Sequence, residues 1–345
     1  MKQLKTIYQF AAVVVISVFF SCSGGQKGSE QAEVTNQKAV TKPVEINAEA
    51  KLLLDYLVES GDYVNSREFP SLIGAEATLE ALSGKTLVID MRKPEVFTKG
   101  HIKGAVNVEI SGLTDYFANK IKPFEYDNII LACYSGQSSS YSTSLLRLMG
   151  YGNVYSLRWG MNGWSPKMEN KWLDNISSDY EEQLDTVDHQ KAIPADFPVF
   201  NTGKSTGAEI FDERIASLFT EYPDATISAD SVFSHPEKYY IINYERKDKY
   251  DSGHVPGSVR YKPNGMLGII SEMQTIPTNK EIVVYCGTGH YSAFVTAYLR
   301  LFGYNAKTLR FGNNSFMHSK MVAEKDKLSW LPFTESEVMD YPVVK

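Results

Sequence analysis

Residues 127–164 read DNIILACYSGQSSSYSTSLLRLMGYGNVYSLRWGMNGW, and residues 279–316 repeat that pattern as NKEIVVYCGTGHYSAFVTAYLRLFGYNAKTLRFGNNSF. Cys286 lies 153 residues after Cys133, and the same offset relates the upstream segments GHIKGAV and GHVPGSV. Self-similarity at a fixed long spacing indicates duplication of a structural unit. The chain of 345 residues therefore contains two homologous domains of about 150 residues each.

Within each copy, short apolar runs alternate with helical patterns. The runs NIILAC and EIVVYC are too short for helices and are typical of strands buried on both faces of a parallel sheet. The segments that follow, SYSTSLLRLMGY and YSAFVTAYLRLFGY, carry apolar residues at helical spacing and stop at glycine. This order predicts an α/β fold in which each cysteine lies in a short loop between a strand and a helix.

The bounds of the two domains follow from the segments that surround the repeats. An additional amphipathic helix is expected before each copy, at residues 51–59 and 213–221. Residues 177–204 contain prolines and a charge-rich stretch, which predicts a linker. The first domain is therefore expected at residues 48–176 and the second at residues 205–345.

The first residues have the pattern of an export signal. In residues 1–22, lysines precede a short apolar run that ends in Ser21-Cys22. The pattern resembles a bacterial lipoprotein signal, which implies that Cys22 carries lipid; simple secretion is the alternative. Residues 23–47 are polar and predict a flexible tether. We expect an exported protein of the cell envelope that is anchored to a membrane through lipid.

Charge and cysteine content limit the other partners. The net charge is -6 and the pI is near 5.6, with scattered Lys and Arg, so no nucleic acid partner is expected. Three cysteines are few for a disulfide framework, although a bond between Cys133 and Cys286 is an alternative. The six histidines lack ligand spacing, so we expect no metal site, and nothing indicates a cofactor.

The loops after the cysteines suit a reactive thiolate. Glycines allow backbone N–H groups near a helix N-terminus to turn toward a sulfur anion and lower its pKa. A buried structural thiol is the alternative for one cysteine, but two at equivalent positions favour chemistry. The predicted catalytic residues are Cys286 and Cys133, and the predicted substrate-binding residues are Ser135, Gly136, Gln137, Ser138, Gly287, Thr288, Gly289, His290 and Tyr291.

Phosphate transfer is disfavoured by the loop composition. A cysteine phosphatase of the tyrosine-phosphatase type needs an arginine after five intervening residues, where it clamps phosphate. Those positions hold Ser139 and Ser292.

Three motifs together resemble a tandem rhodanese over residues of about 65 to 335. They are the Asp90-Met91-Arg92 strand end, the GHIKGA/GHVPGS element, and the cysteine loop with its helix and LR(W/F)G turn. The resemblance implies two domains, each a mainly parallel five-stranded sheet flanked by helices, with Asp90 and Arg92 as structural support. It also implies transfer of a sulfane sulfur from thiosulfate or 3-mercaptopyruvate to cyanide or a thiol, through a persulfide on Cys286, with Cys133 as the candidate for a second site.

The chain departs from that family in its charges. Ser138 and Tyr291 stand where thiosulfate-using members usually carry a basic residue, and the loop CGTG is similar to that of mercaptopyruvate sulfurtransferases. Asn243, Glu245 and Lys249 replace the usual Asp, Arg and Glu. Glu245 and Lys249 are predicted to form the same ion pair with its ends exchanged. These departures leave two alternatives, a persulfide carrier without fast turnover and a degenerate module that binds a partner.

Three further side chains have two interpretations each. His290 is expected at the mouth of the Cys286 loop, where it would stabilise a thiolate or a donor carboxylate, or else as an exposed bystander. Arg158 and Arg310 follow the next strand, and they either supply the positive charge that the loops lack or form internal salt bridges.

Overall fold

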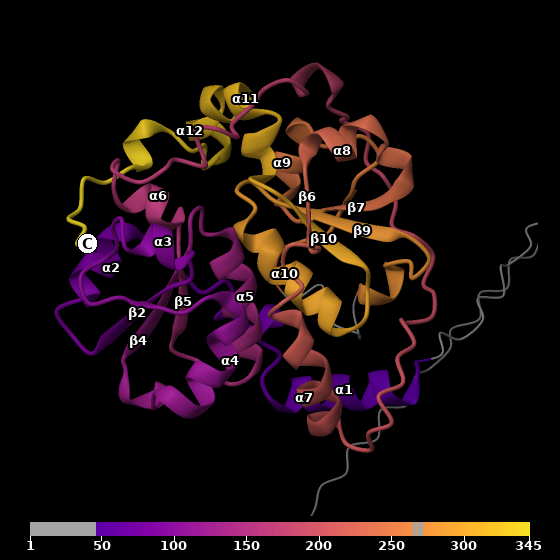
Figure 1. Cartoon of the computed structure of the whole chain (residues 1–345). Coiled ribbons are helices and arrows are strands. Elements are labelled where there is room, and N and C mark those ends of the chain that lie inside the picture. The colour runs from indigo at the N-terminus through magenta and orange to yellow at the C-terminus, as the bar shows by residue number, and fades with distance from the viewer. Residues whose placement is uncertain (1–45, 265–266, 268–271) are drawn as a thin grey trace, which may run out of the picture. The chain divides into compact units, whose positions relative to one another are not determined.

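A computed structural model describes residues 46–264, 267 and 272–345 (Figure 1). The first sheet has the order β1-β5-β4-β2-β3. Its strands are β1 (Leu72–Ile73), β2 (Thr86–Asp90), β3 (Val106–Asn107), β4 (Asn128–Ala132) and β5 (Val154–Leu157). The second sheet repeats this order as β6-β10-β9-β7-β8. Its strands are β6 (Thr226–Ile227), β7 (Tyr239–Asn243), β8 (Val259–Arg260), β9 (Glu281–Tyr285) and β10 (Ala306–Leu309).

Helices flank both sheets, whose strand pairings are all parallel. In the first copy they are α2 (Ala75–Ala81), α3 (Pro94–Phe97), α4 (Leu113–Asp115), α5 (Gln137–Leu148) and α6 (Gly160–Trp164). In the second they are α8 (Ala229–Ser234), α9 (Lys247–Ser252), α10 (His290–Leu301), α11 (His318–Ala323) and α12 (Lys325–Leu328). Two five-stranded sheets flanked by helices confirm the predicted α/β class and the duplication.

The two additional helices lie against each other. The helix expected at residues 51–59 is α1 (Ala48–Glu59), and the one expected at residues 213–221 is α7 (Gly207–Leu218). Helix α7 begins and ends earlier than predicted. It begins earlier because the Thr206 hydroxyl caps it by accepting a hydrogen bond from the Glu209 backbone N–H. Tyr56 of α1 and Phe211 of α7 contact each other with ring centroids 5.4 Å apart.

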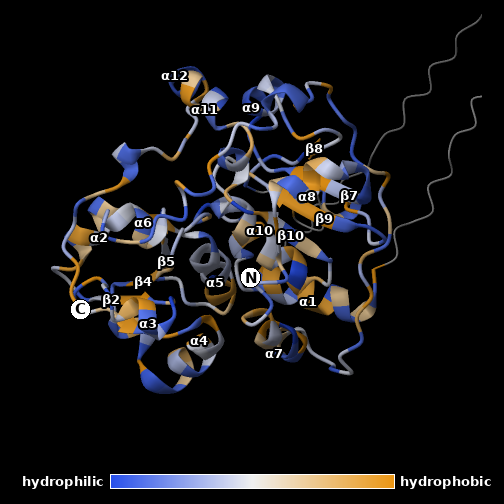
Figure 2. Cartoon of the chain, turned by 45° about the horizontal axis from the view of Figure 1, so that its top comes forward, coloured by the Kyte–Doolittle hydropathy of each residue, from blue (hydrophilic) through white to orange (hydrophobic). Residues whose placement is uncertain are grey.

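One hydrophobic core runs between the two sheets. Along β4, Ile129 and Leu131 face this shared core, whereas Ile130 faces a separate core on the other side of its sheet. Helices α5 and α10 fill the space between the sheets, and the Ser144 hydroxyl of α5 donates a hydrogen bond to the Phe294 carbonyl of α10. Helix α5 is rich in small hydroxyl residues and has largely intermediate hydropathy colours in Figure 2.

The segment after each copy covers the other copy. In the linker at residues 177–204, Asp185 forms an antiparallel bridge with His254 of the second copy. At the C-terminus, Val344 forms the corresponding bridge with His101 of the first copy. Each segment therefore holds the turn that carries the GH motif of the copy it did not follow.

The described residues contain no helix that is long and apolar enough to cross a membrane. Residues 1–45, and with them the predicted lipid-bearing Cys22, lie outside the described residues.

Candidate active site

Each cysteine follows a central strand and precedes a helix, as the repeat predicts. Cys133 follows β4 and Cys286 follows β9, and both are buried. Gly136 has φ +89° and Gly289 has φ +76° at the positions that begin α5 and α10. This left-handed backbone favours glycine, which explains a glycine three residues after each cysteine.

The turn after β5 or β10 closes on the cysteine loop of the same copy. The Met161 N–H donates to the Cys133 carbonyl at 2.8 Å, and the Asn313 N–H donates to the Cys286 carbonyl at 3.0 Å. A Cβ at Gly160 or Gly312 would overlap the loop backbone. The glycine of the LR(W/F)G motif is therefore required by the close approach of the turn to the loop.

The thiol of Cys286 lies among polar groups of α10. The Ser292 N–H is 3.4 Å from Cys286 Sγ, and the Ser292 hydroxyl oxygen is 3.7 Å away. Burial raises the pKa of the Cys286 thiol and the Glu245 carboxylate raises it further, whereas the backbone N–H groups of Ser292 and Thr288 lower it. The loop amides therefore oppose the effect of burial.

The thiol of Cys133 has a comparable environment. The Gly136 N–H lies 3.1 Å from Cys133 Sγ, and the Ser139 hydroxyl lies 3.4 Å from it. Ser139 and Ser140 also bond to the Ser156 hydroxyl of β5. Ser139, which stands where a phosphatase carries an arginine, therefore orders the cysteine loop and does not clamp an anion.

A cavity of about 560 Å³ opens onto Cys286. Gly287, Thr288 and Tyr291 line it together with the cysteine, whereas Gly289 and His290 do not. Its other lining residues include five cations, Arg246, Lys247, Lys249, Arg260 and Lys262. These cations come from the start of α9 and from the end of β8 and the residues after it, so they meet at the carboxyl edge of the sheet. Sequence reasoning missed them, although the run ERKDK at residues 245–249 was a signal.

The predicted ion pair of the second copy is present. Lys249 Nζ lies 3.4 Å from Glu245 Oε2, and the two side chains are largely buried. Glu245 Oε1 also accepts a hydrogen bond from the Gly287 N–H at 2.5 Å, so the carboxylate ties down the cysteine loop.

The first copy carries the usual pair instead. Asp90 and Arg92 are buried with oxygen and nitrogen 2.6 Å apart, and the Arg92 guanidinium also donates to the Gly100 carbonyl. In the second copy Asn243 donates to the Tyr285 hydroxyl at 2.8 Å. That hydroxyl also accepts a hydrogen bond from the Val255 N–H, so the tyrosine fastens the turn after α9 to the end of β9.

His290 does not lie at the loop mouth, and it is not an exposed bystander. It is 1% exposed, its Nδ1 lies 2.8 Å from the Thr288 hydroxyl, and its Nε2 lies 3.1 Å from the Ser135 carbonyl of the other copy. Burial lowers the pKa of His290 to about 3. A neutral imidazole with its proton on Nε2 satisfies both contacts. His290 therefore ties the two cysteine loops together and supplies no charge, a placement set by packing between the copies.

The remaining predicted loop residues lie around this contact. Gln137 Oε1 accepts a hydrogen bond from the Phe311 N–H, and the Ser135 carbonyl accepts one from Trp172 Nε1. Ser138 follows Gln137 in the first turn of α5 and is half-buried. Among the described residues, Arg158 and Arg310 form no ion pair, so nothing in that part of the chain supports the salt-bridge interpretation of these two arginines. Arg158 lowers the pKa of Tyr291, which burial raises.

Comparison with known proteins identifies both copies. The family described as Rhodanese-like domain matches residues 75–167 and residues 232–318. The chain is 33% identical over 101 residues to thiosulfate sulfurtransferase GlpE of Pseudoalteromonas translucida (strain TAC 125), a match that covers 29% of this chain and 92% of that protein. It is 30% identical over 128 residues to YrkF of Bacillus subtilis (strain 168), covering 35% of this chain and 66% of that protein.

A solved structure covers more of the chain. Thiosulfate sulfurtransferase from Pseudomonas aeruginosa matches with a TM-score of 0.29 and 17% sequence identity, over 75% of this chain and 46% of that one. The sequence relatives each match about a third of the chain or less, which is the length of one of its domains.

Proposed function

This chain belongs to the rhodanese-like family, and from that premise we propose that it is a sulfurtransferase with Cys286 as its nucleophile. The observation that carries the proposal is the cavity at Cys286, whose walls bring cations to a cysteine loop rich in backbone N–H groups. The sulfurtransferase names of two relatives agree with this activity. Cys133 is proposed as a second, subordinate site.

The reaction has two displacement steps at sulfur. The Cys286 thiolate attacks the outer sulfur of thiosulfate, the sulfur–sulfur bond of the donor breaks, and sulfite leaves with the bonding electron pair. The cysteine then carries a persulfide. Cyanide or a thiolate attacks the terminal sulfur, and the electron pair of the broken bond returns to Cys286. With 3-mercaptopyruvate as donor, a carbon–sulfur bond breaks instead, and the carbon takes the electron pair and a proton to give pyruvate.

The cavity favours a small anionic donor. Tyr291 stands where a loop cation is usual, but Arg260 and Lys262 bring positive charge to the same cavity from outside the loop. Among the described residues neither cation has a carboxylate partner. The Arg260 guanidinium donates one hydrogen bond to the Glu245 carbonyl, and its other N–H groups can bind a sulfonate or carboxylate. The charge that the loop lacks is thus supplied by the cavity walls.

The test is sulfur transfer from thiosulfate and from 3-mercaptopyruvate to cyanide, with Cys286→Ser and Cys133→Ser compared. We expect Cys286→Ser to lose at least about a thousandfold in rate, and Cys133→Ser to retain most of it. Mass spectrometry after exposure to each donor should find one added sulfur on Cys286. If neither donor is consumed and neither cysteine gains sulfur, the chain is not a sulfurtransferase.

A persulfide carrier is the second candidate, and Glu245 is the observation that favours it. Its carboxylate accepts the hydrogen bond of the Gly287 N–H and raises the pKa of the Cys286 thiol. A smaller fraction of Cys286 is then thiolate at neutral pH, which slows each turnover. A carrier would accept sulfur from a donor in a single turnover and fail to pass it to cyanide at a steady rate.

We also propose that the chain is exported and held at a membrane by lipid on Cys22, from the residues of its first segment. Cys22→Ala should then move the protein from the membrane fraction to the soluble fraction. Retention of the variant in the membrane fraction would contradict the anchor.

A further inference from the structure

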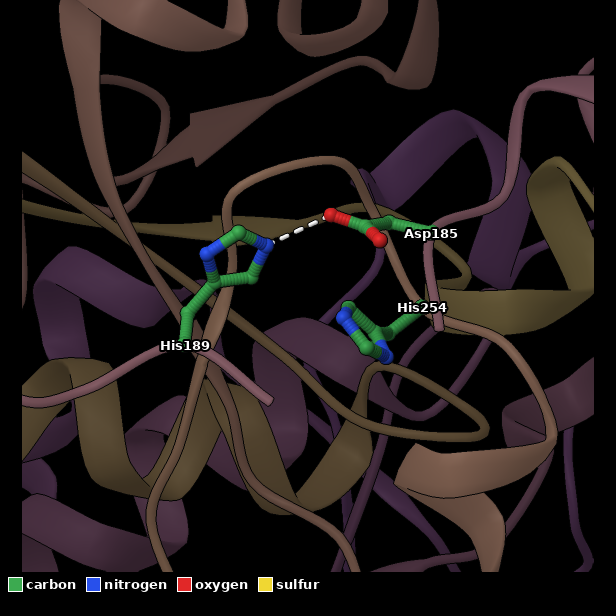
Figure 3. Close-up of side chains that lie close together, drawn as sticks. All are labelled: Asp185, His189 and His254. Carbon is green, nitrogen blue, oxygen red and sulfur yellow. Dashed lines mark hydrogen bonds and ion pairs between the residues drawn. The ribbon is translucent and has the colours of Figure 1, made fainter. Parts of the chain in front are cut away.

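Three side chains with metal-binding atoms meet where the linker crosses the second copy (Figure 3). Asp185 and His189 belong to the linker, and His254 belongs to the turn after α9. One ligand atom from each lies within 4.8 Å of the other two. His189 Nε2 is 2.5 Å from Asp185 Oδ2, as the dashed line in Figure 3 marks. A carboxylate and two imidazoles are a donor set that suits zinc and similar ions.

His254 has one more acceptor than a neutral imidazole can satisfy. Its Nδ1 lies 2.8 Å from the Tyr250 carbonyl, and its Nε2 lies 3.1 Å from the Val187 carbonyl. A neutral ring carries one N–H, so one of its nitrogens must present a lone pair to a carbonyl oxygen. An imidazolium would donate to both, but it would place a charge on a ring that is 0% exposed.

A bound cation resolves this conflict. With Nδ1–H donating to the Tyr250 carbonyl, the lone pair of Nε2 is free for a metal ion. Metal-ligating histidines usually donate their other ring N–H to such a carbonyl or to a carboxylate. The ring of His254 is also stacked on Tyr250, with centroids 3.7 Å apart, which fixes its orientation.

We propose that Asp185, His189 and His254 bind a divalent transition-metal ion of the zinc class. The Val187 carbonyl is placed to act as a fourth ligand, because neighbouring ligands of a tetrahedral ion with bonds of about 2.1 Å lie roughly 3.4 Å apart. Its observed separation of 3.1 Å from His254 Nε2 is close to that value. The Asp185–His189 contact must lengthen slightly to admit the ion.

The first copy provides an internal comparison. His101 stacks on Phe97 with centroids 3.7 Å apart and contacts the Phe97 carbonyl, as His254 does with Tyr250. The segment bridged to His101 presents Val344 where the second copy presents Asp185. The histidine turn is thus common to both copies, whereas the counterpart of Asp185 is the apolar Val344. The fold of this turn therefore does not require a carboxylate at that position.

The ion would fasten the linker to α9. The Tyr250 hydroxyl donates to the Ser258 carbonyl and accepts a hydrogen bond from the His189 N–H, so α9 and the linker already meet at this point. The first residues of α9 line the Cys286 cavity. Metal binding would therefore stabilise the part of the second copy that carries the cations of the cavity.

The test is metal binding by the full chain, with Cys22→Ser, Cys133→Ser and Cys286→Ser removing thiolate ligands. After chelator treatment, Zn²⁺ is titrated calorimetrically and Co²⁺ is titrated by visible absorption. We expect one ion per chain, the strong absorption of tetrahedral Co²⁺, and a melting temperature that rises by a few degrees at excess Zn²⁺. This readout is independent of sulfur transfer, so it stands or falls separately from the proposed activity.

His189→Gln and Asp185→Asn should each weaken binding by at least about tenfold. The matched controls are His235→Gln and Asp188→Asn, which change an exposed histidine and a nearby exposed linker carboxylate. Melting temperatures without metal check that all variants fold. The proposal is overturned if the parent binds no ion, or if the two site variants bind Zn²⁺ as tightly as the controls do.

Discussion

Gln137 and His290 occupy equivalent positions in the two copies, and each reaches the cysteine loop or closing turn of the other copy. Gln137 Oε1 accepts a hydrogen bond from the Phe311 N–H at 2.9 Å, and His290 Nε2 lies 3.1 Å from the Ser135 carbonyl. A Cβ at Gly289 would contact the Gln137 amide, and one at Gly136 would overlap His290. The two loops are thus held as one unit across the pseudo-symmetric interface, so a change in one is expected to affect the other.

His290 should make the stability of the chain depend on pH. Its pKa is lowered from 6.5 to about 3 by burial, so the unfolded chain binds the proton more tightly than the folded chain. The stabilisation is complete above pH 6.5 and is lost as pH falls toward 3, at up to about 1.4 kcal/mol per pH unit. Urea unfolding gives the free energy of unfolding, which should fall between about pH 7 and pH 5. The fall should be roughly 2 kcal/mol smaller in His290→Gln than in the parent.

The control for this prediction is His235→Gln, which changes an exposed histidine. It should leave the pH dependence of unfolding as it is in the parent. An equal drop in His290→Gln and in the parent would show that His290 is not held neutral in the fold.

Glu245 should hold back the reactivity of Cys286. Glu245→Gln keeps an oxygen that accepts from the Gly287 N–H but removes the negative charge that raises the pKa of the thiol. We expect the pH midpoint of Cys286 alkylation by iodoacetamide, measured in a Cys22→Ser/Cys133→Ser background, to move to lower pH. Glu281→Gln, at the opposite end of β9, should not move it. An unchanged midpoint in Glu245→Gln would show that the Glu245 carboxylate does not raise the pKa of the Cys286 thiol.

The sequence predicted what depends on local pattern and missed what depends on packing between distant segments. The two sheets and the positions of Cys133 and Cys286 followed from short apolar runs and glycines, because strands and tight turns are encoded locally. The role of His290 did not follow, since the partner of its Nε2 is 155 residues away. The approach of Arg260 and Lys262 to the Cys286 cavity, and of His189 to His254, was missed for the same reason.

Lys262 should bring anionic donors to the cavity. It is exposed at the rim, and its charge contributes about 1 kcal/mol to a nearby anion in water, which corresponds to roughly fivefold in affinity. Lys262→Gln should therefore raise KM for thiosulfate several-fold with little change in kcat, and the difference should shrink at high salt. Lys280→Gln, which removes an exposed lysine elsewhere, should change neither constant. A loss confined to kcat would contradict a role in binding the donor.

Breaking the buried ion pair of Asp90 and Arg92 should cost more free energy of unfolding than breaking an exposed ion pair. Both side chains are at most 2% exposed, so Arg92→Met leaves an unpaired buried carboxylate and should cost about 3–5 kcal/mol in urea unfolding. Lys122→Met breaks an exposed pair with Glu125 and should cost less than about 1 kcal/mol. A similar small loss in Arg92→Met would mean that Asp90 is solvated or protonated without its partner.

Copying the second copy's residues should not repair this loss. Asp90→Asn/Arg92→Glu installs the residues found at Asn243 and Glu245, but the amide of Asn243 depends on the Tyr285 hydroxyl. The position equivalent to Tyr285 is Ala132, which has no hydroxyl to receive that amide or to bind the turn that follows. We therefore expect the double variant to unfold at lower urea than the parent. Stability equal to that of the parent would show that the tyrosine hydroxyl is dispensable to the arrangement of the second copy.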